Sequence, residues 1–246
     1  MKNSSYNNIA KDYDLKRKKP WNSLELYFKS LKEKGYSFKE LIVDLGCANG
    51  RHFPLLYNSD SRLIGIDNSI ELLKIAREYL NDETQYTKKQ SNYIQIVLAD
   101  FISLPIRPQK IQHIFSIATL HHARDKFERL NAISEIFNSL GNNGFIFITV
   151  WRRWQKKFID YFIKDWLKRR FSFKFKNQQK NIGLTEFGDI HVPWKISNEI
   201  IACNRFYHLF TKRELKKLMK NFSVKTFTKY GGSKNKDNYF ILAQKV

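Results

Sequence analysis

The stretch Asp44-Leu45-Gly46-Cys47-Ala48-Asn49-Gly50 decides the fold of this chain. It continues the short apolar run 41–45, which predicts a buried strand, and it precedes a predicted helix at 50–57. Small residues at the end of a strand let the backbone turn sharply and pass close to a ligand. The N terminus of the next helix adds free N–H groups that bind an anionic group. The stretch therefore predicts a nucleotide-binding loop at the carboxyl edge of an α/β sheet.

Two further acids lie where the next two predicted strands end. Asp67 follows the predicted strand 62–66, and Asp100 follows the predicted strand 93–98. An acid about 20 residues after a glycine loop binds ribose hydroxyls in dinucleotide folds. Three acids at the ends of three successive strands therefore predict a nucleoside site along this edge of the sheet.

The order Asp-x-Gly-x-Ala-x-Gly differs from the Gly-x-Gly-x-x-Gly of NAD-binding loops. It resembles the loop of class I S-adenosylmethionine (SAM) dependent methyltransferases. The resemblance implies SAM as the cofactor, with the leading acid near the methionine amine and the third acid at the adenine. Ala48 stands where this family usually has its middle glycine, and we expect its φ to stay negative. The residues expected to bind SAM are Asp44, Gly46, Cys47, Ala48, Asn49, Gly50, Asp67, Asn68, Asp100, Phe101 and Ile117.

The rest of the chain extends the strand–helix alternation around this loop. It predicts helices at 6–13, 23–34, 70–80 and 126–140, and further strands at 113–118 and 145–150. The segment 151–204 shows no clear strand and is interpreted as a basic insertion after strand five. A capped helix at 211–221 and an antiparallel hairpin, 223–229 with 239–244, follow. These patterns predict an α/β fold with a seven-stranded, mostly parallel sheet, and its antiparallel C-terminal hairpin makes it resemble the Rossmann-like fold of class I methyltransferases.

The 246 residues are expected to form one methyltransferase domain. Its predicted parts are the N-terminal helices (1–40), the SAM-binding core (41–150), the basic insertion (151–204) and the C-terminal part of the sheet (205–246). Two cysteines exclude a disulfide framework and a four-cysteine zinc site, and no metal site is expected. No long apolar run predicts a membrane span, and the first residues have no apolar signal core. The expected location is the cytoplasm.

The charge points to a polyanionic partner. Lys and Arg number 44 against 23 acids, a formal net charge of +21. Such a surface favours nucleic acid, although a lysine-rich proteome would give the same count. Basic and aromatic residues alternate through 151–180 at helical spacing, which predicts an amphipathic helix that contacts tRNA or, alternatively, only covers the sheet.

Residues after the fourth strand narrow the methyl acceptor. The segment 116–122 lacks the Asn/Asp-Pro-Pro-aromatic motif of amino-methylating enzymes, and no cysteine lies where pyrimidine carbon-five enzymes need a nucleophile. Four motifs instead resemble the eukaryotic-type tRNA wobble (carboxymethyluridine) methyltransferase family. They are Tyr6-x-x-Ile9-Ala10-x-x-Tyr13 with Arg17-Lys18-Lys19-Pro20-Trp21, then Ser116–His122, Gly188–Trp194 and Arg205–Phe210.

This resemblance implies methyl transfer to the carboxylate of 5-carboxymethyluridine in tRNA. Arginines suit a carboxylate or phosphate, histidines donate hydrogen bonds, tryptophans stack on a flipped uridine, and an aspartate accepts from uracil N3–H. The alternatives are that the arginines and lysines form a solvated face, the tryptophans belong to the core and the histidines shape a helix entry. The expected catalytic residues are Arg17, Lys19, Trp21, His121, His122, Asp189, Trp194, Arg205 and His208.

The resemblance also implies two partners. One is tRNA, through its anticodon stem-loop. The other is a small zinc-binding methyltransferase activator subunit, expected to pair along the exposed third strand, 93–98. Two other functions stay open at this point: a small-molecule methyltransferase, and a non-catalytic RNA-binding relative that kept the fold.

Overall fold

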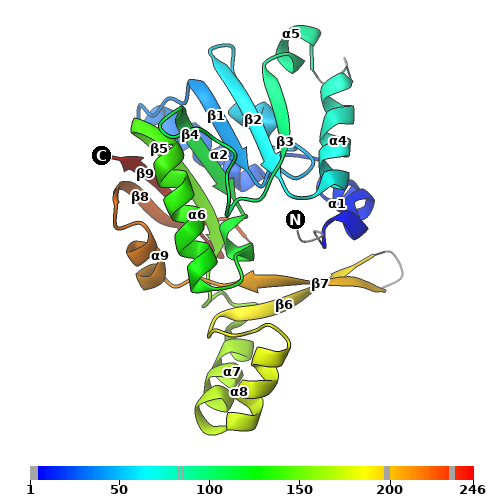
Figure 1. The fold of residues 1–246 in the computed structure, drawn as a ribbon, viewed down its shortest axis with the longest axis vertical. Helices are drawn as coiled ribbons and strands as arrows, with labels where there is room; N and C mark the ends of the chain where they lie inside the picture. Colours follow the sequence, from blue (N-terminus) through cyan, green and yellow to red (C-terminus); the bar gives the residue numbers. More distant parts are fainter. Residues whose placement is uncertain (1–4, 83, 85, 197–199, 233–235) are drawn as a thin grey trace.

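The computed structural model has a seven-stranded sheet in the order β3-β2-β1-β4-β5-β9-β8 (Figure 1). It describes residues 5–82, 84, 86–196, 200–232 and 236–246. Strands β1 to β5 run parallel, and β9 lies antiparallel to both β5 and β8. The predicted fold class is thereby confirmed. The strands are β1 (Glu40–Leu45), β2 (Ser61–Asp67), β3 (Ile94–Leu98), β4 (Ile111–Ile117), β5 (Leu140–Trp151), β8 (Phe222–Tyr230) and β9 (Asn238–Lys245).

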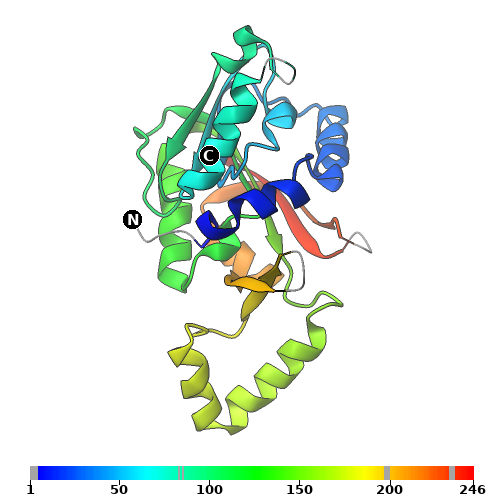
Figure 2. The same cartoon turned by 90° about the vertical axis from the view of Figure 1, so that its right-hand side faces the viewer.

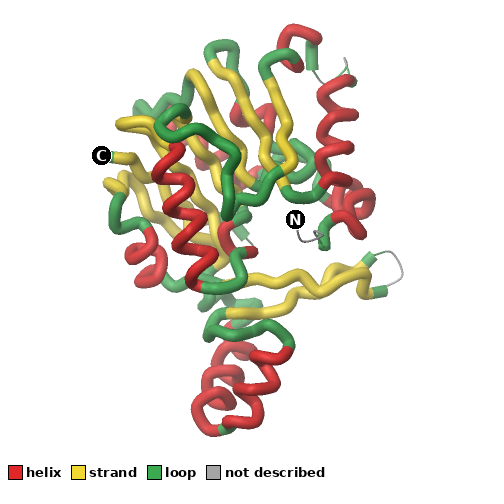
Figure 3. Tube along the Cα trace, viewed as in Figure 1, coloured by secondary structure: helices red, strands yellow, loops and turns green. Residues whose placement is uncertain are grey.

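Helices cover both faces of the sheet (Figures 1 and 3). On one face α2, α3 and α4 bury apolar side chains against β1, β2 and β4. On the other face α6 and α9 bury apolar side chains against the sheet. The buried stripe of α6 consists of Ala132, Ile133 and Ile136. These helices are α2 (Asn22–Glu33), α3 (Phe53–Leu56), α4 (Ile70–Asn81), α6 (Lys126–Ser139) and α9 (Lys212–Leu218).

Capping residues explain where several helices begin. The Thr211 hydroxyl and the Glu214 side chain form the expected capping box of α9. The spacing of Asn68 and Glu71 predicts a capping box for α4, but the cap is Ser69, which is extended and whose hydroxyl accepts from the Leu72 N–H. Asn22 is the first residue of α2 and not its cap. A second capping box, at Thr87, starts the short helix α5 (Lys88–Ser91) in a segment predicted as loop.

The insertion contains two strands, contrary to expectation. β6 (Asp189–Lys195) and β7 (Ile201–His208) pair antiparallel in a separate two-stranded sheet. Ile190, Val192 and Trp194 are buried and alternate with more exposed residues, as in a half-buried strand. The expected boundary between 204 and 205 therefore falls inside β7. Helices α7 (Ile159–Phe171) and α8 (Phe173–Asn181) project beyond this hairpin (Figure 2).

The N-terminal segment crosses the carboxyl edge of the sheet. It comprises a 3₁₀ turn, η1 (Asn7–Ile9), and the helix α1 (Ala10–Lys16), and a second 3₁₀ turn, η2 (Leu120–His122), follows β4. Ser4, expected to cap the first helix, and residues 233–235 of the expected C-terminal turn lie outside the described residues. Among the described residues, no helix has the length and apolar character that a membrane crossing requires.

Candidate functional site

A cavity of about 540 Å³ opens where β1, β2 and β4 end. Parallel strands bring their carboxyl ends to one edge, so the segments after these strands share the cavity wall. One side is lined by residues expected to bind the cofactor, and the other by residues from the N-terminal segment, η2, β6 and β7. The first group is Gly46, Cys47, Ala48, Asp67, Asn68, Asp100, Phe101 and Ile117; the second includes Tyr6, Tyr13, His122, His191, Asn204 and Arg205.

Asp67 holds the glycine loop in place. One carboxylate oxygen accepts from the Ala48 N–H at 2.8 Å, and the other accepts from the Ser69 N–H at 2.8 Å. Burial raises the pKa of Asp67 to about 6, even though these backbone hydrogen bonds favour its charged form. A carboxylate has about four acceptor positions, so Asp67 keeps capacity for ribose hydroxyls inside the cavity.

The loop has left-handed backbone at three alternate positions, Gly46, Ala48 and Gly50. Gly46 has φ +79°, and a Cβ there would lie 2.1 Å from Thr119 Oγ1. Ala48 has φ +52°, so the expectation of a negative φ was wrong. The hydrogen bond to Asp67 fixes the Ala48 N–H in this orientation, and the loop imposes a conformation that destabilises an alanine by about 1–2 kcal/mol.

We expect Ala48→Gly to raise the free energy of unfolding by about 0.5–1 kcal/mol. The relief of left-handed strain outweighs the extra freedom that glycine gives the unfolded chain. Urea unfolding of both proteins measures the difference. The control is Ala132→Gly in α6, which should lose about 1 kcal/mol or more because glycine weakens a helix interior. A lower free energy of unfolding in Ala48→Gly would contradict the claim that the backbone of Ala48 is strained.

Asp44 is the least satisfied acid of the site. It is buried at the end of β1, and within the described part of the chain neither carboxylate oxygen has a hydrogen-bond partner. Burial and the neighbouring charge of Asp67 raise the pKa of Asp44 to about 7. An unpaired buried carboxylate is unfavourable, so a cationic group of a ligand would stabilise it.

Asp44, Asn49 and Gly50 do not line the cavity, although all three were expected to bind the cofactor. The Asn49 side chain points to the N-terminal segment and donates to Asp14 Oδ1 at 2.7 Å and to the Arg17 carbonyl at 3.2 Å. Tyr79 donates to the other oxygen of Asp14 at 2.6 Å. These contacts fasten α1 across the glycine loop.

The described residues fit SAM. Within the lining, Asp67 offers acceptors for ribose hydroxyls and Phe101 an apolar wall beside Asp100. Asp44 lies behind this lining at the end of β1 and offers an unpaired carboxylate for an ammonium. Close backbone approach at Gly46 leaves room at the end of β1.

Arg205 carries the positive charge on the other side of the cavity. It is half-buried, and its guanidinium lies 4.6 Å from the centre of the Trp194 ring and 5.2 Å from that of Tyr207. Its Nε has no hydrogen-bond partner among the described residues. Stacking between two rings pre-orients the guanidinium fork, the geometry that suits a carboxylate.

His122 is a neutral hydrogen-bonding residue at this wall. Its Nδ1 lies 2.9 Å from the Phe206 carbonyl, which only accepts, so Nδ1 carries the proton. Nε2 then accepts from the Tyr6 hydroxyl at 3.1 Å. Burial, with the charge of Arg205, lowers the pKa of His122 to about 4. Both ring nitrogens are thus engaged within the protein, while His122, which was expected to be catalytic, lines the cavity beside Tyr6.

Several expected catalytic residues lie outside the cavity. Arg17 and Lys19 are exposed on the surface. Trp21 packs on Phe240, with ring centres 5.3 Å apart, and so joins the core instead of offering a free face. His121 is buried, and its Nδ1 accepts from the Trp151 N–H.

Trp194 is buried behind the cavity wall and does not itself line the cavity. It stacks on Tyr13 with ring centres 5.7 Å apart, and donates from its indole N–H to Asp12 at 2.6 Å. Because Tyr13 and Arg205 lie over it, Trp194 leaves no open face for a uridine. It connects α1 to β6 and positions Arg205.

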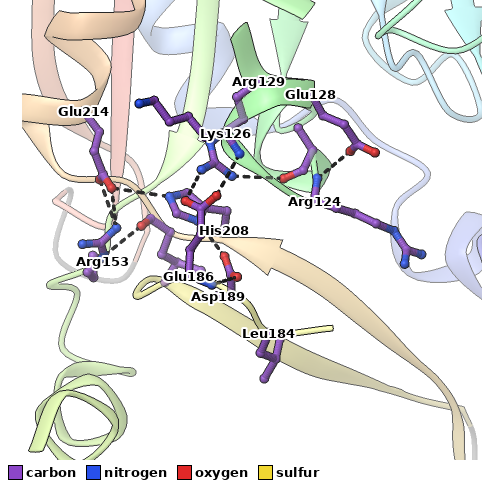
Figure 4. A network of polar contacts seen from close by, with 12 residues as sticks. Arg124, Lys126, Glu128, Arg129, Arg153, Leu184, Glu186, Asp189, His208 and Glu214 are labelled. Atoms are coloured by element: carbon purple, nitrogen blue, oxygen red, sulfur yellow. Dashed lines mark hydrogen bonds and ion pairs between the residues drawn. The ribbon is translucent and has the colours of Figure 1, made fainter. Parts of the chain in front are cut away.

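Asp189 and His208, both expected to be catalytic, are buried in a polar network and do not line the cavity (Figure 4). Asp189 Oδ1 lies 2.7 Å from His208 Nδ1, and Oδ2 accepts from the Glu186 N–H at 2.6 Å. His208 Nε2 lies 3.6 Å from Glu214, which also pairs with Arg153 at 2.8 Å. Burial raises the pKa of Glu214, but His208 and the charge of Arg153 outweigh it and hold this pKa well below its usual value. The network fastens the β6–β7 hairpin to α9.

Replacement of Asp189 by Ala is therefore expected to lower the free energy of unfolding by about 3 kcal/mol, because it leaves buried donors without an acceptor. Urea unfolding measures it. The matched control is Asp160→Ala, an exposed acid on α7, with an effect within about 0.5 kcal/mol. Unchanged stability together with lost activity would restore the catalytic role that the sequence suggested.

Sequence reasoning missed part of the cavity wall. The aromatic pair Tyr6 and Tyr13 stood in a motif, yet neither was assigned a role. Arg51 follows the glycine loop directly, a signal that was available. His191 and Phe206 also stood in quoted motifs without a role, whereas Arg124 and Asn204 come from distant segments and carry no local signal.

Comparison with known proteins gives one family match. A model of the methyltransferase domain family matches residues 43–148. The tRNA (carboxymethyluridine(34)-5-O)-methyltransferase of Schizosaccharomyces pombe is 28% identical over 98% of this chain and 94% of that protein. The Arabidopsis thaliana protein of that name is 31% identical over 59% of this chain, a match that spans 31% of its own length.

Solved structures share the fold. A SAM-dependent methyltransferase from Methanosarcina mazei has a TM-score of 0.67 at 19% identity, over 88% of this chain and 97% of that one. A methyltransferase solved in complex with the Haloferax volcanii Trm112 methyltransferase activator has a TM-score of 0.56 at 13% identity, over 98% and 95% of the two chains.

Proposed function

The chain belongs to the class I SAM-dependent methyltransferases, and from this premise we propose that it methylates the carboxylate of 5-carboxymethyluridine at the wobble position of tRNA. The observation that carries the proposal is Arg205, a pre-oriented guanidinium with an unpaired Nε on the wall that faces the cofactor loop. A carboxylate acceptor matches this charge and geometry. The relatives named as tRNA carboxymethyluridine methyltransferases support the same acceptor.

The reaction needs positioning more than proton transfer. SAM supplies an electrophilic methyl group when it is bound. A carboxylate with a pKa near 4 is already ionised at neutral pH, so the chain needs no general base. His122 agrees with this, because its pKa of about 4 leaves it neutral and its nitrogens serve Tyr6 and Phe206. Arg205 holds the carboxylate in position for the transfer.

The cofactor side has a complementary charge. We propose that Asp44 pairs with the methionine ammonium, that Asp67 binds the ribose and that Asp100 lies at the adenine. Methyl transfer converts the acceptor carboxylate into a neutral ester. Arg205 then loses its ionic partner, which favours release of the product.

A zinc-binding activator subunit is proposed at β3. This strand is an edge of the sheet. Tyr93, the residue before it, and Leu98, its last residue, expose 45% and 40% of their surface. An edge strand with exposed apolar side chains offers both backbone hydrogen bonds and apolar area to a second chain. The structural relative solved with the Trm112 activator supports such a pairing. We place the complex in the cytoplasm, with the tRNA anticodon stem-loop as its substrate.

The test is nucleoside mass spectrometry of tRNA incubated with SAM and the protein, with and without the activator. The tRNA carries carboxymethyluridine at the wobble position, and tRNA with an unmodified uridine is the control. A methyl ester on the modified tRNA alone is the expected result. Measurable SAM binding with no ester in any combination would refute the acceptor and favour a small-molecule substrate or a non-catalytic relative.

A further inference from the structure

Helices α7 and α8 form an arm, residues 159–181, that projects from the β6–β7 hairpin (Figures 1 and 2). The side of the arm that faces the β6–β7 hairpin attaches it to the rest of the protein. Phe158 and Phe162 are buried against Ile190, Val192 and Tyr207 of the hairpin. Arg169 pairs with the buried Asp165 at 2.7 Å. The outer side and the tip are not needed for this packing.

The tip combines exposed aromatic rings with cations. Phe171 and Phe173 flank the turn between the helices and expose 77% and 78% of their surface. The Arg170 guanidinium lies 5.9 Å from the centre of the Phe171 ring. Exposed cations continue from the end of α7 along α8: Lys164, Lys168, Arg170, Lys174, Lys176 and Lys180.

The arm has little negative charge to balance these cations. Its acids are Asp160 and Asp165, and the latter is already paired with Arg169. Its outer side therefore suits a partner that is both anionic and able to stack on aromatic rings. Single-stranded nucleic acid has this combination, because phosphates alternate with bases along its strand.

The arm is continuous with the cavity. Ile182 and Gly183, directly after α8, line the cavity wall. The nine residues of α8 extend roughly 14 Å from there to the tip, at 1.5 Å per residue. That length equals the rise of about four nucleotides at 3.4 Å each. RNA whose target base enters the cavity would thus have flanking nucleotides within reach of the tip.

We infer that the arm is an RNA-binding element that holds the substrate RNA outside the cavity, with Phe171 and Phe173 stacked on unpaired bases and the lysines of α8 on phosphates. The inference rests on the proposed function for the identity of the RNA. An anionic membrane is the alternative partner, because it would bind the cations while the exposed Trp166 and Leu167 of α7 insert into its interface. RNA is favoured because the base of the arm lines the reaction cavity.

The test measures binding of fluorescent carboxymethyluridine tRNA to the full-length protein by anisotropy over a range of salt concentrations. Phe171→Ala with Phe173→Ala should raise the Kd for RNA about 10-fold or more. Tyr at both positions should restore binding, since a phenol ring still stacks. Lys174→Gln, Lys176→Gln and Lys180→Gln together should reduce the log–log salt slope by about 2. The Kd for SAM should stay at its wild-type value in each variant.

The matched control removes three exposed lysines at α2, which lies away from the arm (Figure 2): Lys29→Gln, Lys32→Gln and Lys34→Gln. Its Kd and salt slope should match the wild type. The same Kd and slope in the arm variants would overturn the inference. So would loss of binding to phosphatidylserine vesicles with unchanged RNA binding.

Failure of the inference differs from failure of the proposed function. If the wild type forms the methyl ester and the arm variants bind RNA normally, the RNA-binding role of the arm is refuted and the proposed reaction stands. If RNA binding depends on the arm but no methyl ester forms, the role of the arm stands and the proposed acceptor is refuted.

Discussion

Replacement of Arg205 by Ala is expected to lower kcat/KM for methyl-ester formation on carboxymethyluridine tRNA by about 100-fold or more. Arg205 is half-buried between Trp194 and Tyr207, with an unpaired Nε. Truncation of one member of a desolvated, hydrogen-bonded charge pair loses roughly 2–5 kcal/mol. Initial rates at several tRNA concentrations measure the effect.

Arg17→Ala is the matched control. Arg17 also approaches the Trp194 ring, at 6.0 Å, but it is exposed. Water screens an exposed charge, so we expect a loss of less than about 5-fold. Arg205→Lys should fall between the two, because lysine keeps the charge and loses the planar fork. Near wild-type kcat/KM in Arg205→Ala would refute the carboxylate contact.

Replacement of Asp44 by Asn is expected to weaken SAM binding about 100-fold at pH 8, because the cofactor ammonium loses its buried charged partner. The protonation of Asp44 also determines the direction in which the Kd of the wild type for SAM changes with pH. Burial and Asp67 raise the Asp44 pKa to about 7, so the free protein holds a proton there below pH 7 and must lose it to pair with an ammonium. The wild-type Kd should therefore tighten about 10-fold between pH 6 and pH 8.

Isothermal titration of SAM at several pH values checks this expectation. The Asn variant should lose most of this dependence and keep only a smaller step near pH 6, where Asp67 has its pKa of about 6. Urea unfolding separates a binding effect from loss of structure. An Asn variant with the wild-type pH profile would show that Asp44 does not carry the charge.

Local sequence patterns predicted the sheet and the cofactor side of the cavity. The order of strands and helices follows from periodicity, and the structure reproduces it as β1 to β5 followed by the β8–β9 hairpin. The glycine loop, Asp67 and Asp100 each follow a strand directly, so the parallel sheet alone places them at one edge. Even here, contacts between segments changed details. Ala48 takes a positive φ because Asp67 holds its N–H, and Asn49 turns away to bind Asp14.

The tertiary structure determined which residues form the cavity wall opposite the glycine loop. Its contacts join residues far apart in the chain, such as Tyr6 with His122 and Asp12 with Trp194, which are 116 and 182 positions apart. Residue type cannot tell an open ring from a covered one, so Trp21 and Trp194 were predicted as stacking faces and lie instead in packed surroundings.

The sequence by itself thus determined the class of fold and the position of the cofactor loop, because both depend on local periodicity and on residues adjacent to strand ends. Only the tertiary structure decided which polar residues line the cavity. Asp189, Arg205 and His208 lie in the same hairpin, yet Arg205 lines the cavity while Asp189 and His208 are buried in a network with Glu214. Alternation along the strands does not separate them, because His191 and Phe206 share the face of Asp189 and His208 and still line the cavity. The physical reason is the long-range contact of His208 with Glu214 of α9, which no local pattern of the sequence encodes.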